Sequence, residues 1–142
     1  MRVKRIRLIY FSATNTTQTV VRRIGASISK LLNVPVQEND FTLPKARKQE
    51  IFCQSDELAI VGVPVYAGRV PNKLLPYVRD AIHGSKTLAV PVVLYGNRDY
   101  DDALIELRDV LESNGFRTIA GAAFVGEHSF SKILAAGRPD TE

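Results

Sequence analysis

The segment RIRLIYFSATNTT, residues 5–17, decides the fold of this chain. Residues 5–11 alternate at first and are then continuously apolar, which is typical of a strand that enters a buried sheet. Residues 12–17 supply four hydroxyl side chains, one Asn and no charge, and a helical pattern begins at Thr16. A strand that passes through an uncharged polar turn into a helix is the opening of a β–α unit.

This turn has two interpretations that the segment alone leaves open. In the first, Asn15 or Thr16 caps the helix and the turn does nothing more. In the second, the unpaired backbone N–H groups of the first helical turn bind a phosphate, which the positive end of the helix dipole attracts. Hydroxyls of Ser12, Thr14 and Thr17 would then donate to the phosphate oxygens.

The rest of the chain continues the alternation of strands and helices. Apolar runs predict strands at residues 35–41, 57–63, 87–95 and 116–125. Helical spacing predicts a helix at residues 16–32, with an apolar face of Val20, Ile24, Ile28 and Leu31. It predicts a second helix after the loop 64–71, with a face of Leu74, Leu75, Val78, Ala81 and Ile82. A third helix is predicted from Asp99 or Asp101 to Asn114, with Leu104, Leu107 and Leu111 on its apolar face. This order predicts an α/β fold with a parallel sheet covered on both faces.

Two segments are less regular. Residues 44–55 are polar and fit either a loop or one or two helical turns. Pro91 falls inside a predicted strand, where its missing N–H would remove a ladder hydrogen bond, so we expect a bulge or a later strand start there.

The loops that carry chemistry should converge. A doubly wound sheet of five parallel strands commonly has the order 2-1-3-4-5, and ligands bind at the carboxyl ends of its strands. The loops 12–17, 64–71 and 95–101 follow strands one, three and four, which are neighbours in this order. Tyrosines and glycines in the second and third loops, such as Tyr66, Gly68 and Tyr100, suit a flat ring held between them.

These loops carry a resemblance to a known family. Ser12-Ala13-Thr14-Asn15-Thr16-Thr17 resembles the flavodoxin phosphate loop, Ser/Thr-x-Thr-Gly-x-Thr, with Asn15 in place of the glycine. Asn tolerates left-handed backbone better than most residues, so the turn can keep its shape. Gly96-Asn97-Arg98-x-Tyr100 resembles the second flavin-side loop of bacterial flavodoxin-like domains. Together with residues 64–71 and 137–140, the chain is most similar to the amino-terminal flavodoxin domain of flavodoxin/ferredoxin fusion (EFR-type) proteins.

The resemblance implies a flavodoxin-like three-layer sandwich, with a five-stranded parallel sheet in the order 2-1-3-4-5, that binds FMN. The residues it implies for the phosphate are Ser12, Thr14, Asn15, Thr16 and Thr17. Those it implies for the isoalloxazine ring are Pro64, Tyr66, Ala67 and Gly68 on one side and Gly96, Asn97, Arg98 and Tyr100 on the other. It divides the chain into an FMN-binding domain, residues 1–128, and a C-terminal tail or linker, residues 129–142.

The function implied is that of an electron-transfer flavoprotein rather than a turnover enzyme, without catalytic residues of its own. Two alternatives remain. An FMN-dependent quinone or NAD(P)H oxidoreductase shares this fold, although the chain has no Gly-x-Gly-x-x-Gly fingerprint for a dinucleotide. A flavin-free interaction module, such as a receiver domain, would need clustered acids after the first strand, where this chain has Ser12.

The charge and composition limit the kinds of partner molecule that we expect for this chain. The net charge is +4 and the isoelectric point about 9.4, which fits an acidic redox partner protein. The resemblance implies a ferredoxin domain as the other candidate partner. No stripe of Lys and Arg interleaves with aromatics, so we expect no nucleic acid partner. No apolar run approaches the ~20 residues of a membrane span, and we expect a cytoplasmic protein. A single cysteine, Cys53, and two distant histidines, His83 and His128, predict neither a disulfide nor a metal site.

Overall fold

The computed structural model describes residues 2–12, 15–65, 70–71, 73–95, 101–125 and 130–134. Its strands are β1 (Arg5–Tyr10), β2 (Val36–Asp40), β3 (Ile51–Phe52), β4 (Glu57–Val65), β5 (Ile82–His83), β6 (Thr87–Tyr95), β7 (Phe116–Thr118), β8 (Gly121–Val125) and β9 (Phe130–Leu134). Its helices are α1 (Thr16–Leu32), the short 3₁₀ helix η1 (Ala46–Lys48), α2 (Leu74–Ala81) and α3 (Asp101–Ser113).

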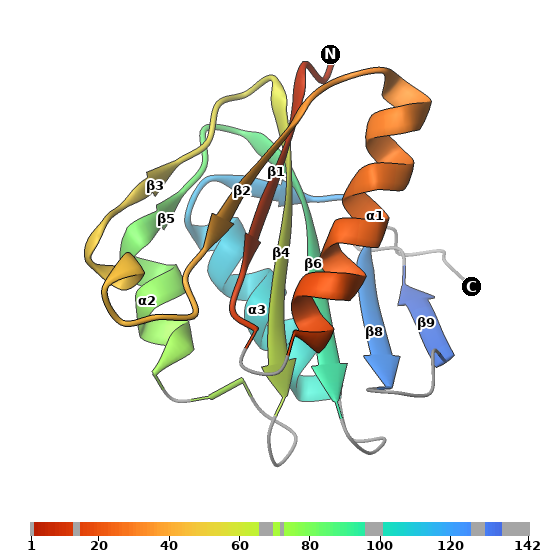
Figure 1. The fold of residues 1–142 in the computed structure, drawn as a ribbon. Coiled ribbons are helices and arrows are strands. Elements are labelled where there is room, and N and C mark those ends of the chain that lie inside the picture. Colours follow the sequence, from red (N-terminus) through yellow and green to blue (C-terminus); the bar gives the residue numbers. More distant parts are fainter. Residues whose placement is uncertain are drawn as a thin grey trace.

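The main sheet has the predicted doubly wound order. Its strands run β2-β1-β4-β6-β8-β9, with β7 also paired to β6 (Figure 1). Apart from β9, all of these pairs are parallel. The predicted order 2-1-3-4-5 is therefore confirmed for β2, β1, β4, β6 and β8. The five-stranded count is too small, because the predicted strand 116–125 is divided into β7 and β8 and because β9 is added.

Strand β9 lies in the segment that was expected to be a tail or linker. It pairs antiparallel with β8 and forms one edge of the sheet. Its sequence, Phe130–Leu134, has five residues with Lys132 at the centre, so it has no apolar pattern long enough to predict a strand. Residues 135–142 lie outside the described residues.

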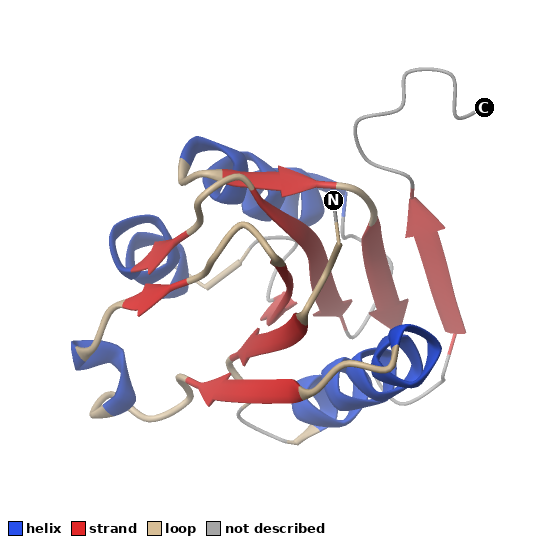
Figure 2. Ribbon diagram, turned by 90° about the horizontal axis from the view of Figure 1, so that it is seen from above, coloured by secondary structure: helices blue, strands red, loops and turns tan. Residues whose placement is uncertain are grey.

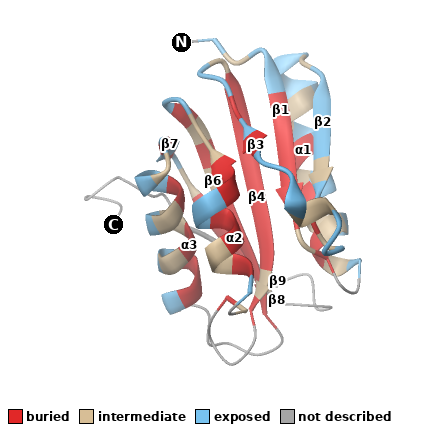
Figure 3. Cartoon of the chain, turned by 90° about the vertical axis from the view of Figure 1, so that its left-hand side faces the viewer, coloured by how far each residue is buried: buried red, intermediate tan, exposed pale blue. Residues whose placement is uncertain are grey.

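Helices cover both faces of the sheet, as predicted for a three-layer sandwich. Figure 2 shows α1 on one face and α2 with α3 on the other. Two apolar cores result, one of which contains Leu8 and Ile60 and lies under α1, while the other contains Ile9 and Val61 and lies under α2 and α3. In Figure 3 the central strands are buried, while the edge strand β2 is largely exposed.

The buried side of α1 differs from the predicted one. Its fully buried residues are Thr17, Val21 and Gly25, which are spaced by four along the helix. Leu31, which was expected on the apolar face, is 82% exposed. Gly25 lies very close to the sheet, since a Cβ on this residue would be 2.6 Å from the Leu8 Cδ2 atom. The absence of a side chain at Gly25 therefore lets α1 approach β1 closely. Spacing alone could not distinguish this small-residue face from the wider apolar stripe beside it.

Pro91 lies in the middle of β6 without interrupting it. Thr87, Leu88 and Ala89 pair with β7, and residues from Val92 onward pair with β8. Pro91 therefore faces the break between β7 and β8, where a ladder donor is not needed. The expected irregularity is present, but it occurs in the neighbouring strand.

Candidate functional site

Three strand ends come together at one edge of the sheet, as predicted. Tyr10, the last residue of β1, pairs with Gly62 of β4, and Val65 of β4 pairs with Tyr95 of β6. The strands β1, β4 and β6, which precede the three predicted site loops, therefore lie next to one another in the sheet. In sheets of this kind that edge is where ligands bind.

The turn between β1 and α1 is built around Asn15. This residue has φ 66° and ψ −7°, which is left-handed backbone, and its side chain makes no capping hydrogen bond. Left-handed backbone is ordinary for Gly and tolerated by Asn. The position that holds Gly in the flavodoxin loop thus needs this conformation here as well, and Asn15 supplies it.

In the first turn of α1, one backbone N–H is satisfied by the side chain of Ser12 and not by that of the N-cap residue Asn15. The Ser12 Oγ accepts a hydrogen bond from the backbone N–H of Gln18 at 2.9 Å. Ser12 is only 8% exposed. This capping oxygen comes from four residues before the helix starts. No acidic side chain occupies the first turn of α1 itself.

Thr42 is a residue of this site that the sequence analysis missed. Its Oγ1 accepts a hydrogen bond from the Ser12 backbone N–H at 2.8 Å. The Thr42 backbone N–H in turn donates to the Asp40 Oδ1 at 2.9 Å, which is the spacing of a local Asx turn. The Asp-x-Thr sequence at the end of β2, residues 40–42, could have indicated such a turn beside β1.

Thr17 is held between the helix and the sheet. It is 3% exposed, and its Cγ2 lies 3.1 Å from where a Cβ on Gly62 would be. Gly62 therefore allows α1 to approach β4 closely at the end that carries the turn. This contact ties the position of the turn to the core.

Pro64 was predicted in the loop after the third strand, and this is wrong. It belongs to β4, is partly buried and pairs with Leu94 of β6. It lies beyond the last residue pair between β4 and β1. Most other predicted site residues lie outside the described residues, namely Thr14, Tyr66, Ala67, Gly68, Gly96, Asn97, Arg98 and Tyr100. His128 also lies outside them.

Cys53 has the properties of a buried core residue. It is 2% exposed, and burial raises the pKa of its thiol to about 11. Very little thiolate is then present at neutral pH, so the side chain is a poor nucleophile. Among the described residues, no three His, Cys, Asp or Glu side chains gather as a metal site would require.

Helices of the described ranges are too short or too polar to cross a lipid bilayer.

Tyr10 links β1 to the neighbouring strand β2 and to α1. Its hydroxyl donates to the Glu38 Oε1 at 2.7 Å and accepts from the Gln18 Nε2 at 2.9 Å. Burial is the main cause that raises the pKa of Tyr10, so this hydroxyl stays protonated at neutral pH. It fixes Gln18 and with it the first turn of α1.

Comparison with known proteins gives matches among solved structures. Neither protein-family models nor curated protein sequences match the chain. An archaeal flavodoxin aligns with TM-score 0.64 at 16% identity, over 85% of this chain and 82% of that one. A protein assigned as a flavoprotein from Bacteroides uniformis aligns with TM-score 0.57 at 12% identity, over 87% and 90%.

A third structure, of a protein assigned as a flavoprotein from Bacteroides eggerthii, aligns with TM-score 0.54 at 15% identity, over 84% of this chain and 87% of that one. All three alignments extend over most of both chains. They agree with the strand order and with the helices on both faces. The chain therefore has a flavodoxin-like α/β fold.

Proposed function

We propose that this protein binds FMN without a covalent bond and serves in electron transfer. The observation that carries the proposal is the start of α1, where left-handed Asn15 and buried Ser12 shape a turn with no acidic side chain in the first helical turn. The flavodoxin-like fold supports it, because the same strand ends are the ligand-binding edge of such sheets.

The described residues fit a phosphate group. The Ser12 hydroxyl accepts from the Gln18 N–H, and among the described residues its own proton has no acceptor, so it can donate to a phosphate oxygen. The helix dipole places positive potential at the same point. Thr42 holds the Ser12 backbone in place by accepting its N–H. The turn thus presents donors to an anion without a Lys or Arg.

For the ring, the proposal uses the segments after β4 and β6, which start side by side at Val65 and Tyr95. We assign Tyr66, Ala67 and Gly68 to one face of the ring and Gly96, Asn97, Arg98 and Tyr100 to the other, on the resemblance alone. A bound flavin supplies the redox chemistry, and the chain supplies position and shielding from water.

An acidic redox partner is part of the same proposal. The segment after the edge strand carries Lys45, Arg47 and Lys48, and it follows Thr42, whose Oγ1 accepts from the Ser12 N–H. The Arg47 Nη1 donates to the carbonyl oxygens of Phe41 and Thr42, both at 2.9 Å. Cations beside a cofactor edge would steer an acidic protein toward it.

The test is a titration of FMN with the purified protein, followed by quenching of flavin fluorescence. Riboflavin, which lacks the phosphate, is the matched ligand. We expect saturation at one FMN per chain and at least about tenfold weaker binding of riboflavin, since a charge-assisted hydrogen bond contributes roughly 1.5–3 kcal/mol. Absence of FMN quenching, or equal affinity for riboflavin, would contradict the proposal.

Replacement of Ser12 by Ala should weaken FMN binding by about tenfold, because it removes one phosphate donor and the acceptor for the Gln18 N–H. The titration above measures it. Thr19→Ala is the matched control, since the Thr19 hydroxyl lies on the exposed side of the same turn and donates to the Asn15 carbonyl oxygen at 2.8 Å. The control should bind FMN as the parent does. Equal losses in both variants would mean that the effect is on the helix start in general.

Asn15→Gly and Asn15→Ala test whether the left-handed backbone is what the turn requires. Gly should leave FMN binding equal or tighter. Ala should weaken it by about five- to thirtyfold, because left-handed backbone costs roughly 1–2 kcal/mol for residues other than Gly, Asn and Asp. A large loss with Gly would instead assign a ligand contact to the Asn15 side chain.

A further inference from the structure

A second cavity lies away from the strand ends. Its volume is about 490 Å³, within the range of small-molecule sites. Residues that line it include Arg7, Asn39, Phe41, Ile51, Phe52 and Tyr77. They come from β1, β2, β3 and α2, on the face of the sheet opposite α1. The cavity exists because only η1 and the two-residue β3 separate β2 from β4, so no helix covers this part of the sheet.

The walls of the cavity are aromatic and its mouth is apolar. Phe41 and Tyr77 are almost fully buried, and their ring centroids are 4.9 Å apart. Leu43 is 67% exposed and Phe52 is 59% exposed, and both line the same cavity. The Phe52 ring also stacks on the ring of His83, with centroids 4.8 Å apart. Leu43 and Phe52 therefore give the cavity mouth an apolar lining against which a flat ring could pack.

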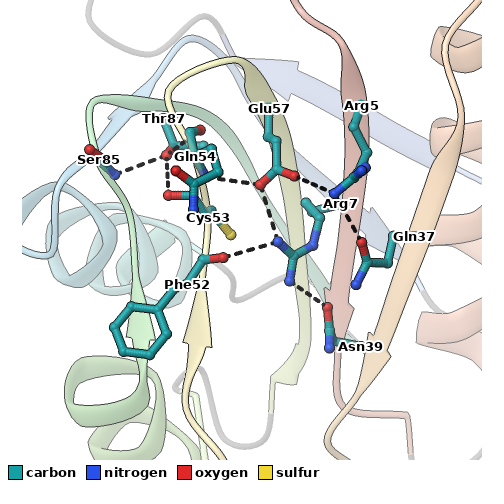
Figure 4. A network of polar contacts seen from close by, with 10 residues as sticks. All are labelled: Arg5, Arg7, Gln37, Asn39, Phe52, Cys53, Gln54, Glu57, Ser85 and Thr87. Carbon is teal, nitrogen blue, oxygen red and sulfur yellow. Dashed lines mark hydrogen bonds and ion pairs between the residues drawn. The ribbon is translucent and has the colours of Figure 1, made fainter.

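The inner wall of the cavity holds a buried guanidinium group. The side chain of Arg7 is 8% exposed. Figure 4 shows its Nη1 donating to the Phe52 carbonyl oxygen and to the Glu57 Oε1, each at 3.1 Å, and its Nη2 donating to the Asn39 Oδ1 at 2.9 Å.

The guanidinium of Arg7 therefore has N–H groups that no described residue accepts from. These bonds account for three of the five N–H donors of its guanidinium. Among the described residues, its Nε is buried without an acceptor. One N–H of Nη2 also has no acceptor there.

The charges around the cavity favour an anionic ligand. Its acidic residues already have partners, since Glu38 accepts from Arg22, Asp40 accepts from Thr42, and Glu50 lies 2.7 Å from the His83 Nε2. Lys45 lines the cavity, and its ammonium group has no ion-pair or hydrogen-bond partner in the described part of the chain. Glu57 is shared between Arg7 and the exposed Arg5, so one carboxylate faces two guanidinium groups. Arg7 and Lys45 therefore keep N–H donors without acceptors in the described part of the chain, whereas each carboxylate that lines the cavity already has a partner.

We propose that this cavity binds a small aromatic carboxylate. Its ring would lie between Phe52, Leu43 and the buried wall of Phe41 and Tyr77. Its carboxylate would accept from Arg7 Nη2 and from the amide nitrogen of Asn39, with Lys45 close to it. This site shares no residue with the segments assigned to FMN, so it stands independently of the proposed function.

The test is a titration of the ¹⁵N-labelled protein with 2-naphthoate, followed by NMR. Saturating FMN is present in a parallel sample, so that binding at the flavin site can be recognised. We expect saturable shifts of the Arg7 Nε–Hε signal and of backbone amides in residues 43–52, with a Kd of about 1 mM, which is typical of a fragment of this size. The neutral 2-naphthylmethanol should bind at least about tenfold more weakly, because it lacks the carboxylate that Arg7 would bind.

Three variants locate the site. Ala46→Trp fills the cavity and should abolish the shifts, and Leu43→Gln should weaken binding about threefold by removing apolar contact at the mouth. Leu31→Gln is the matched control, because Leu31 is also exposed but lies at the end of α1 outside this cavity, and it should bind as the parent does. Unchanged shifts in Ala46→Trp, an absence of saturable shifts at Arg7, or equal binding of the neutral alcohol would overturn the proposal. None of these outcomes depends on FMN binding.

Discussion

Replacement of Glu57 by Gln should lower the free energy of unfolding by about 3–5 kcal/mol, the usual effect of breaking a buried ion pair. Glu57 is 3% exposed. Its carboxylate accepts from Arg7 at 3.1 Å, from Arg5 at 3.0 Å and from the backbone N–H of Gln54 at 2.9 Å (Figure 4). Gln keeps the size and one acceptor but removes the charge, so the buried guanidinium of Arg7 is left without a counter-ion.

Urea unfolding followed by far-UV circular dichroism measures this difference, provided that the dependence on urea concentration stays the same. Arg5→Gln is the matched control. The Arg5 side chain is 48% exposed, and an exposed partner of this kind contributes at most about 1 kcal/mol. The double variant R7M/E57M removes both buried charges and should recover most of the loss. A change of less than about 1 kcal/mol for Glu57→Gln would show that the network is solvated.

Gly62→Ala should lower the free energy of unfolding by roughly 1–3 kcal/mol and weaken FMN binding about tenfold. A Cβ on Gly62 would lie 2.4 Å from the Val21 Cγ2 and 3.1 Å from the Thr17 Cγ2. Val21 is fully buried, and a β-branched side chain in a helix has one strongly preferred rotamer. The start of α1 must therefore move away from the sheet, and the turn at Ser12 and Asn15 moves with it.

Gly25→Ala is the matched control for this prediction. Its Cβ would lie 2.6 Å from the Leu8 Cδ2, which is the end of a flexible side chain. The gain of about 1 kcal/mol in helix propensity offsets that contact. We expect Gly25→Ala to keep both stability and FMN affinity. If Gly62→Ala loses stability but binds FMN normally, then the turn does not depend on how closely α1 approaches β4.

Local patterns predicted the elements well where they are long. The helix expected at residues 16–32 and the strand expected at residues 87–95 are observed with those bounds. Leu107 and Leu111 are fully buried, as their spacing predicts. Hydrophobic periodicity repeats over several turns or residue pairs in such elements, so it outweighs local exceptions such as Pro91.

Short elements were not predictable in this way. Strands β3, β5 and β9 have two or five residues, and a run of that length does not establish a period. β9 forms beside β8 at the edge of the main sheet, whereas β3 and β5 pair with each other in a separate two-stranded sheet. Each of these strands depends on a partner that is distant in the sequence or has no extended pattern of its own.

The sequence by itself determined the order and type of the main elements, the parallel sheet and the edge at which three loops begin. Only the tertiary structure decided the polar partners. Arg7 meets Glu57, which is 50 residues away, and the Ser12 N–H meets Thr42, which is 30 residues away. Arg7 lies in the alternating start of the first strand, where the sequence pattern does not show a partner for its charge, and it is buried. The physical reason is that apolar burial follows local periodicity, whereas a hydrogen-bond or ion-pair partner depends on which strands become neighbours and in which register.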